Sequence, residues 1–287
     1  WLVQAEAPPG ALFRKFKLMI TSGAAKPEDI AFYFTHWLTD LAGAEPTPLG
    51  GCEKFVTKFP LNVLNSFLRS FHVVGRIAAQ VETEVFEDYL KMRWTDYLAG
   101  LPTGPALVST PTGEDAIARM RLLCMAQMNA DPILQALPCL PEEDRGVLCR
   151  ELSRTGCAGQ AYSAGLVPAD VRESPCGPAL LIYYGPAFLQ SLGSDDPKLR
   201  LGVLAEVYRK SRVLWPLSAE EAGAWVTVRI DVIKAMGVRE IQGVAKEGDR
   251  WVIARRNRTE AFVERRRADE PPGQPEEVQV LNIAPAA

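Results

Sequence analysis

Hydrophobic residues recur every three to four positions through the first two thirds of the chain, which is the spacing of one face of an α-helix. Proline and glycine interrupt this pattern at short intervals and mark the ends of successive helices. The best-defined helix begins at Pro27, has two acidic residues in its first turn and ends at Gly43. The same pattern predicts further helices over residues 60–79, 82–98, 114–129, 141–155 and 195–214.

Later segments depart from the helical pattern. The period changes to two near Val226, and residues 250–256 and 260–266 alternate in the same way about a short loop, which predicts a hairpin. Residues 178–192 combine an apolar run with a Gly-Pro pair; we interpret them as a kinked or split helix, with a buried strand as the alternative. The predicted fold class is mostly α, a multi-helix, bundle-like body with a small C-terminal antiparallel β element (α+β overall).

The chain of 287 residues is long enough to bury a large core. Breaks in the pattern predict four parts along it. They are an N-terminal extension over 1–26, an α-helical domain over 27–217 with a candidate subdomain joint at 100–113, a small β-containing element over 218–267 and a flexible tail over 268–287.

Composition narrows the class of protein. The net charge of −3 offers no general attraction to nucleic acid or to an anionic membrane. The longest apolar runs are far shorter than the roughly 20 residues that cross a bilayer, so we expect no transmembrane segment. Six singly spaced cysteines favour free thiols over disulfides or a zinc site. These features predict an intracellular protein in a reducing compartment, and the first residue, Trp1, suggests that a targeting segment has been removed.

The helix over 27–43 carries the strongest candidate for chemistry. The residues opposite its main apolar stripe are Phe32, Tyr33, His36 and Asp40. Because this side is also partly apolar, we expect both sides of the helix to be covered. His36 and Asp40 are four residues apart and therefore face the same way, which suits an ion pair as well as a shared metal ion.

Histidine and carboxylate side chains on the first helices predict a candidate site for a divalent metal ion. The candidate ligands are His36, Asp40, His72 and Glu82, and the candidate catalytic carboxylates are Glu84 and Glu87. A solvated acidic helix face explains the same carboxylates without a metal. No complete nucleotide-binding or nucleophile motif occurs in the sequence, so no other cofactor is expected.

The predicted hairpin is rich in arginine. Its candidate contacts for an anion or a partner are Arg255, Arg256, Arg258, Arg265 and Arg266. Few aromatic residues alternate with them, so we expect an acidic protein rather than nucleic acid as the ligand, and a solvated strand edge explains the charge equally well. The tail segment from Val278 to Ile283 alternates like a strand and is a candidate docking segment for a partner protein.

Two main hypotheses for the function follow. The leading one is a non-enzymatic protein-interaction or scaffold subunit of a larger assembly, since several helices have apolar residues on more than one face. The alternative is a metal-dependent hydrolase of a phosphorylated or nucleotide-like substrate that uses the His/Asp/Glu set. Near-stoichiometric metal that is lost from a His36→Ala/Asp40→Ala variant would favour the alternative over the scaffold hypothesis. Anion or RNA binding by the arginines is a weaker third hypothesis, which predicts a steep loss of affinity with salt.

Overall fold

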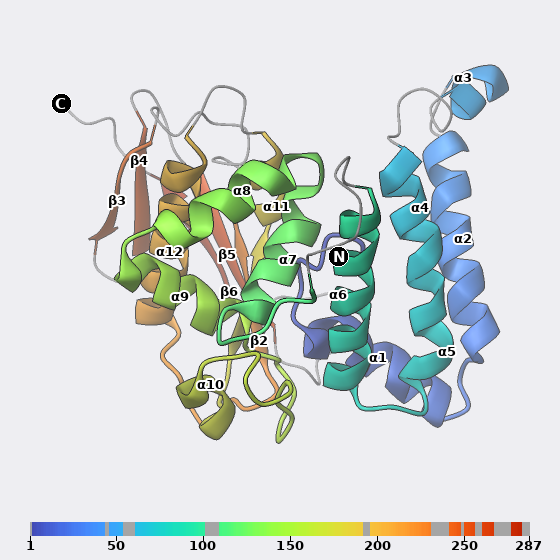
Figure 1. Cartoon of the computed structure of the whole chain (residues 1–287), viewed down its shortest axis with the longest axis horizontal. Helices are drawn as coiled ribbons and strands as arrows, with labels where there is room; N and C mark the ends of the chain where they lie inside the picture. Colours follow the sequence, from blue (N-terminus) through green and yellow to red (C-terminus); the bar gives the residue numbers. More distant parts are fainter. Residues whose placement is uncertain are drawn as a thin grey trace.

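The computed structural model describes residues 2–43, 46–53, 61–100, 109–191, 196–230, 241–247, 250–255, 260–266 and 277–282. It is mostly helical, as predicted (Figure 1). The helices are α1 (Pro9–Thr21), α2 (Pro27–Gly43), α3 (Pro48–Glu53), α4 (Leu61–Ser70), α5 (Val74–Ile77), α6 (Glu82–Ala99), α7 (Ala116–Ala126), α8 (Ala130–Ala136), α9 (Glu142–Leu152), α10 (Ala169–Glu173), α11 (Gly185–Gln190) and α12 (Pro197–Leu214). The strands are β1 (Ala179–Tyr183), β2 (Trp225–Arg229), β3 (Ile241–Glu247), β4 (Arg250–Arg255), β5 (Glu260–Arg266) and β6 (Glu277–Asn282).

Helical spacing and end signals located several helices well. The structure confirms the helix at Pro27–Gly43 with both ends as predicted, and the helix predicted over 82–98 is α6. The helix predicted over 60–79 is instead interrupted by a 3-10 turn at Phe71–Val73 between α4 and α5. Valine and glycine follow this turn and are weak helix formers, which explains the break. None of the described helices combines the length and the apolar content that a bilayer-crossing segment needs.

Ala179–Tyr183 form strand β1 and Gly185–Gln190 form helix α11, so the prediction of a kinked or split helix over 178–192 is wrong and the strand alternative is correct. Leu180 and Ile182 join one buried cluster and Leu181 joins another, so both faces of β1 are covered. Tyr184 adopts φ 72° between the strand and the helix. The Gly-Pro pair that suggested a kink is the first turn of α11, where the missing amide hydrogen of proline breaks no helical hydrogen bond.

The larger sheet has the strand order β1-β2-β5-β6. β1 and β2 are parallel, joined by a connection that includes α11 and α12, and β5 is antiparallel to both β2 and β6. The predicted hairpin between 250–256 and 260–266 is wrong, because β4 pairs with β3 whereas β5 lies between β2 and β6. An isolated two-stranded hairpin is only marginally stable, and pairing with β2 gives β5 a neighbour that belongs to the buried core.

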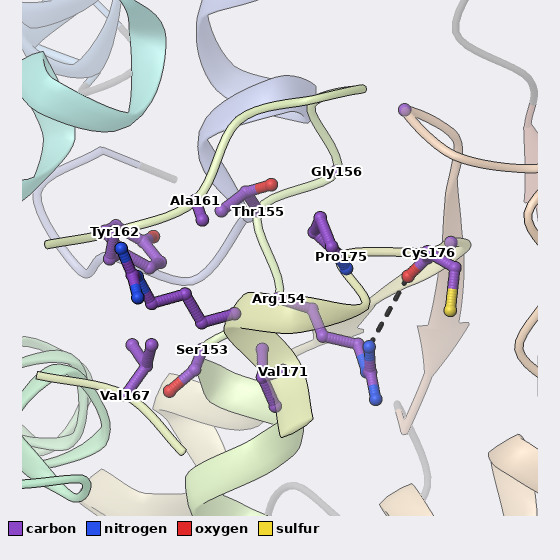
Figure 2. A pocket seen from close by; sticks show the side chains of 13 residues that line it. Ser153, Arg154, Thr155, Gly156, Ala161, Tyr162, Val167, Val171, Pro175 and Cys176 are labelled. Atoms are coloured by element: carbon purple, nitrogen blue, oxygen red, sulfur yellow. Dashed lines mark hydrogen bonds between the residues drawn. The ribbon is translucent and has the colours of Figure 1, made fainter. Parts of the chain in front are cut away.

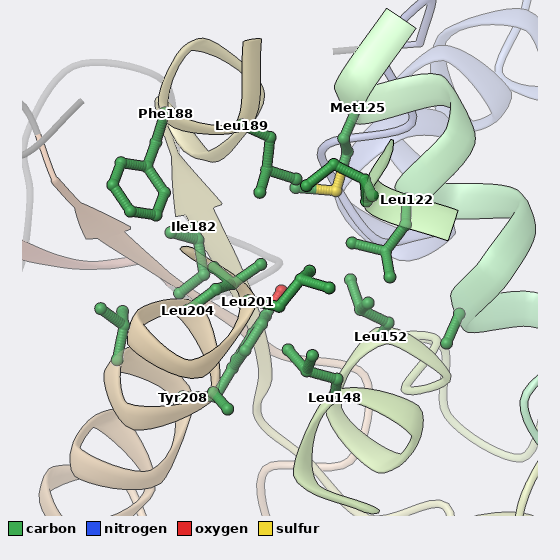
Figure 3. Close-up of a cluster of buried hydrophobic side chains, with 14 of the residues drawn as sticks. Leu122, Met125, Leu148, Leu152, Ile182, Phe188, Leu189, Leu201, Leu204 and Tyr208 are labelled. Carbon is green, nitrogen blue, oxygen red and sulfur yellow. The ribbon is translucent and has the colours of Figure 1, made fainter. Parts of the chain in front are cut away.

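Helix α7 lies at the centre of the hydrophobic core, because nearly all of its residues are buried. Figure 3 shows one of its sides, where Leu122 and Met125 face side chains from α9, β1, α11 and α12. On its other side, Met120 and Leu123 belong to a second cluster with Phe86 of α6. One helix therefore joins the two halves of the core.

The first residues of the chain belong to the core. In the segment expected to be an extension, Ala5 and Ala7 are fully buried, and Phe13 of α1 packs edge-on against Phe86 at 6.1 Å between ring centroids. Arg121 of α7 donates hydrogen bonds to the carbonyl oxygens of Ala5 at 2.9 Å, Glu6 at 2.7 Å and Leu152 at 2.8 Å. This arginine therefore holds the N-terminal segment against the end of α9.

The cysteines with described side chains are free thiols: Cys124, Cys139, Cys149, Cys157 and Cys176. Burial raises the pKa of Cys149 to about 11 and that of Cys157 to about 12. Since the thiolate is the reactive form, these two side chains act as core residues rather than nucleophiles.

Candidate functional site

A pocket lies where the segment after α9 meets α10 and the approach to β1 (Figure 2). It has an empty volume of about 330 Å³, part of which is open to solvent. Its polar lining residues include Ser153, Arg154, Tyr162, Arg172 and Cys176. Most of this volume is the open mouth of the pocket, and its enclosed part has room for about one water molecule.

Three polar atoms in this lining are buried and have no hydrogen-bond partner among the described residues: Ser153 Oγ, Arg154 Nε and Tyr162 OH. Ser153 is 1% exposed and Tyr162 is 3% exposed. Burial raises the pKa of Tyr162 above its ordinary range, so its hydroxyl keeps its proton. Buried polar groups are nearly always paired in native proteins, so these atoms mark the lining of this pocket as a place where ordered water or a small polar group can bind.

Glu87 of α6 holds one wall of the pocket in place. Its carboxylate accepts hydrogen bonds from the backbone nitrogen of Ser163 at 2.9 Å, from Ser163 Oγ at 2.8 Å and from Lys91 Nζ at 2.6 Å. Ser163 follows Tyr162 directly, so this contact positions the tyrosine ring. Glu87 is one of the carboxylates predicted as catalytic, and the structure gives its oxygens a role in holding this loop.

Glu82 anchors the same loop from the beginning of α6. Its Oε2 accepts hydrogen bonds from Gln160 Nε2 at 3.0 Å and from Lys17 Nζ of α1 at 3.2 Å. Glu82 and Glu87 are buried, so the interpretation as a solvated acidic face is wrong for both, whereas Glu84 is exposed. Helix α6 thus joins α1 and the pocket wall through two carboxylates.

Both carboxyls are ionised at neutral pH. Burial alone would raise the pKa of Glu82 and of Glu87, but hydrogen bonds from Gln160, Lys17, Lys91 and Ser163 outweigh it, and both pKa values lie below the ordinary 4.5. A carboxyl with a lowered folded-state pKa stabilises the fold above the pKa of the unfolded chain. This stabilisation is lost as the pH falls through the folded-state value.

We therefore expect a Glu82→Gln/Glu87→Gln variant to lose less stability than the wild type between pH 7 and about pH 3. At pH 7 its free energy of unfolding should be about 1–3 kcal/mol lower, because the charged acceptors are gone. Urea unfolding at both pH values measures this, with Glu84→Gln as the matched control from the same helix. Equal acid sensitivity of the double variant and the wild type would show that these two carboxyls do not govern acid unfolding.

The outer side of α2 is open. The rings of Phe32 and His36 are stacked, with an interplanar angle of 10° and centroids 6.5 Å apart, and His36 Nε2 lies 3.4 Å from Asp40 Oδ1. Phe32 is 72% exposed and Tyr33 is 58% exposed. The prediction that both sides of this helix are covered is therefore wrong within this chain. The three stacked and paired residues Phe32, His36 and Asp40 form what we call the α2 stripe.

The candidate metal ligands are not brought together in the described residues. No group of three His, Cys, Asp or Glu side chains there lies close enough to hold a metal ion. His36 and Asp40 lie on α2, Glu82 lies on α6, and Figure 1 shows α4 and α5 between these two helices. His72 is in the 3-10 turn before α5, and its side chain is outside the described part of the structure. The metal-site hypothesis stays a prediction.

The arginine cluster is described only in part. Arg255 ends β4, and Arg265 and Arg266 end β5, opposite Val226 and Trp225 of β2. Arg256 and Arg258 lie outside the described residues. Binding of an anion or partner by these arginines stays a prediction.

The proposed docking segment of the tail is a strand of the chain's own sheet. Residues 277–282 form β6, which pairs with β5, and Ile283 lies outside the described residues. The candidate subdomain joint at 100–113 also lies largely outside them, since residues 101–108 are not described.

Comparison with models of protein families, with curated proteins and with solved structures gives no match.

Sequence reasoning missed Ser153, Arg154 and Tyr162. They come from the end of one helix and from the loop after it, and no spacing motif connects them to the other pocket residues near 171–177 and 223. The one available signal was the predicted end of a helix just before Gly156, where the chain must turn. Such a signal locates a loop but does not show what the loop encloses.

Proposed function

We propose that this chain is a non-enzymatic interaction subunit that binds a partner protein through the α2 stripe. The observation that supports this most directly is the exposure of Phe32, which stacks on His36 and is 72% accessible on a helix at the edge of the molecule (Figure 1). Large aromatic side chains are enriched among the residues that dominate binding energy at protein interfaces. A partner that covered this stripe would bury the second apolar side of α2.

The charge of α2 indicates the chemistry of this partner. Residues 27–43 include Glu28, Asp29 and Asp40 but neither lysine nor arginine. An acidic, aromatic surface is complementary to an apolar patch bordered by basic side chains, and such complementarity speeds association and selects the partner. We therefore infer a protein with a basic border around an apolar contact site, bound more weakly as salt rises.

The test is site-specific photo-crosslinking of the full chain in an extract of its source cells. A photoreactive phenylalanine analogue replaces Phe32 in one sample and Leu199 in the control, because Leu199 is a 50% exposed apolar residue on α12, on the opposite side of the molecule (Figure 1). We expect a cross-link from position 32 alone, mapping to an apolar site with basic neighbours on a different protein.

Substitution of Phe32 by Asp is expected to weaken this binding at least about tenfold while changing the free energy of unfolding by less than about 0.5 kcal/mol, since the ring is mostly exposed. Binding assays with the captured protein and urea unfolding measure the two quantities. Leu199→Asp should change neither the binding affinity nor the free energy of unfolding. Equal cross-linking from both positions, or unchanged affinity in the Phe32→Asp variant, would contradict the proposal.

A further inference from the structure

The chain ahead of α1 is held in a groove mainly by hydrogen bonds to its backbone carbonyl oxygens. Arg93 of α6 donates from Nη1 to the carbonyl oxygen of Val3 at 2.6 Å. Arg121 of α7 donates from Nε to the carbonyl oxygen of Ala5 at 2.9 Å and from Nη2 to that of Glu6 at 2.7 Å. Every peptide has carbonyl oxygens, so these three bonds recognise the path of a backbone rather than particular side chains.

Side chains add selectivity at three successive positions. Ala5 and Ala7 are fully buried, so neither position has room for a longer side chain. Glu6 between them is also buried, and its Oε1 accepts a hydrogen bond of 2.8 Å from the backbone nitrogen of Tyr184. The groove therefore fits an acidic residue between two small ones. We call residues 2–7 the N-terminal strap and the space that they fill, between α6, α7 and the end of β1, the strap groove.

The donors of the strap groove are held in place by contacts that do not involve the strap. Arg93 Nη1 also donates to Tyr89 OH, one turn earlier on α6, at 2.9 Å. Arg121 Nη1 donates to the carbonyl oxygen of Leu152 at 2.8 Å, and its guanidinium lies 5.9 Å from the centroid of the Phe86 ring. Both guanidinium groups are therefore positioned for a ligand before the strap binds, which lowers the entropy lost on binding.

The strap, by contrast, is under strain in this position. Ala5 has φ 47°, in the left-handed region that alanine seldom occupies. Burial raises the pKa of the Glu6 carboxyl, because its charged form loses contact with water. Both costs disappear when the strap leaves the groove, whereas the donors of the groove stay in place. A preformed site with a strained occupant favours exchange of that occupant for a competing segment.

We propose that the strap groove is a second interaction site, which binds a segment of a partner protein in place of the N-terminal strap. The partner's segment shares the chemistry of the strap, a tight turn followed by a carboxylate between two small side chains. In the free chain the strap covers the groove, so binding requires its displacement. This site uses α6, α7 and the end of β1 and is separate from the α2 stripe.

The first test uses a synthetic peptide with the sequence of residues 1–8, labelled with fluorescein at its carboxyl end, and measures anisotropy with the full chain. In an Ala7→Arg variant, a long cationic side chain replaces a fully buried methyl group and keeps the variant's own strap out of the groove. We expect one peptide to bind per variant chain, at least about tenfold more tightly than to the wild type, whose strap competes at a high effective concentration.

Two controls accompany this measurement. Ala24→Arg introduces the same side chain at an exposed position between α1 and α2, and this variant should bind the peptide as weakly as the wild type. A peptide that carries Glu6→Lys should bind the Ala7→Arg variant at least about tenfold more weakly than the original peptide, because an ammonium group cannot accept the hydrogen bond from Tyr184.

Hydrogen exchange in the wild-type chain tests release of the strap without any substitution. The amide of Tyr184 bonds to Glu6 of the strap, whereas the amide of Ala179, at the beginning of β1, bonds to the carbonyl oxygen of Ala224 at 3.0 Å. Because the strap can leave while the sheet stays intact, we expect the Tyr184 amide to exchange at least about tenfold faster than that of Ala179, after correction for their intrinsic rates.

Four results would overturn the proposal. Equal exchange of the two amides would show that the strap leaves only when the whole chain unfolds, and this measurement decides the matter if the Ala7→Arg variant does not fold. Binding of the peptide to a folded Ala7→Arg variant that is no tighter than to the wild type would exclude an exchangeable site. Equal binding of the Glu6→Lys peptide would exclude recognition of the carboxylate. Wild-type dimers that dissociate when the peptide is added, as measured by sedimentation, would assign the groove to a second copy of the chain instead of a separate partner.

Discussion

Replacement of Arg121 by Met is expected to lower the free energy of unfolding by about 3–5 kcal/mol. The guanidinium is 1% exposed and satisfies three buried carbonyl oxygens, two from the N-terminal segment and one from the end of α9. Methionine fills much of the same volume but leaves all three acceptors unpaired. Burial raises the pKa of the Glu6 carboxyl, and the positive charge of Arg121 partly opposes this, so the loss of Arg121 makes Glu6 costlier to keep ionised. Urea unfolding followed by tryptophan fluorescence measures the change.

Arg119 provides the control from the same helix. Its side chain is partly exposed and pairs with Asp115 at 3.9 Å, a type of ion pair that contributes little. Arg119→Met should therefore cost less than about 1 kcal/mol. Arg121→Lys should still lower the free energy of unfolding by most of the amount expected for Arg121→Met, because an ammonium group lacks the planar fork that reaches three carbonyls. Similar losses at positions 119 and 121 would refute the assigned role of Arg121.

Substitution of Gly10 by Ala is expected to cost about 3 kcal/mol. A methyl group at this position would lie 1.9 Å from the backbone oxygen of Gly156. Because this oxygen belongs to the backbone, no side-chain rotation can relieve the clash. The backbone nitrogen of Gly10, in the first turn of α1, also donates a hydrogen bond to the carbonyl oxygen of Thr155 at 2.9 Å. A shift of α1 away from Gly156 would therefore break this hydrogen bond as well. Thermal and urea unfolding of the purified variant give the cost.

Gly75 is the matched glycine. A methyl group there meets no atom within 4 Å, and alanine is the better helix former in α5. Gly75→Ala should therefore leave the stability unchanged or raise it by about 0.5–1 kcal/mol. A loss of stability at Gly10 no larger than at Gly75 would mean that the close approach of α1 to the 155–156 backbone is not essential.

Local signals in the sequence were sufficient for α2 and α6. Each begins with acidic residues in its first turn, and α2 begins with a proline and ends at a glycine, so neighbours in sequence determine both elements. Strand β1 could not be predicted in the same way, because its run of apolar residues fits a helix or a strand equally. What selects the strand is pairing with β2, which begins more than 40 residues later.

The burial of charged side chains was the least predictable part of the site. Arg119 and Arg121 are two residues apart on an apolar helix, and nothing in that spacing shows which of them is buried. The answer depends on carbonyl oxygens near residues 5 and 152, which are distant in the chain. The same holds for Glu87, whose burial follows from its contact with Ser163.

The buried N-terminal segment also determines when the chain can complete its fold during synthesis. Glu6 accepts a hydrogen bond at 2.8 Å from the backbone nitrogen of Tyr184, a residue 178 positions later. At a translation rate of about 5–20 residues per second, the partner of Glu6 is made roughly 10 to 35 s after Glu6 itself. The ring of Phe13, by contrast, can meet Phe86 of α6 well before that interval has passed. The contact of Glu6 with Tyr184 can therefore form only late, after α1 has been able to pack against α6.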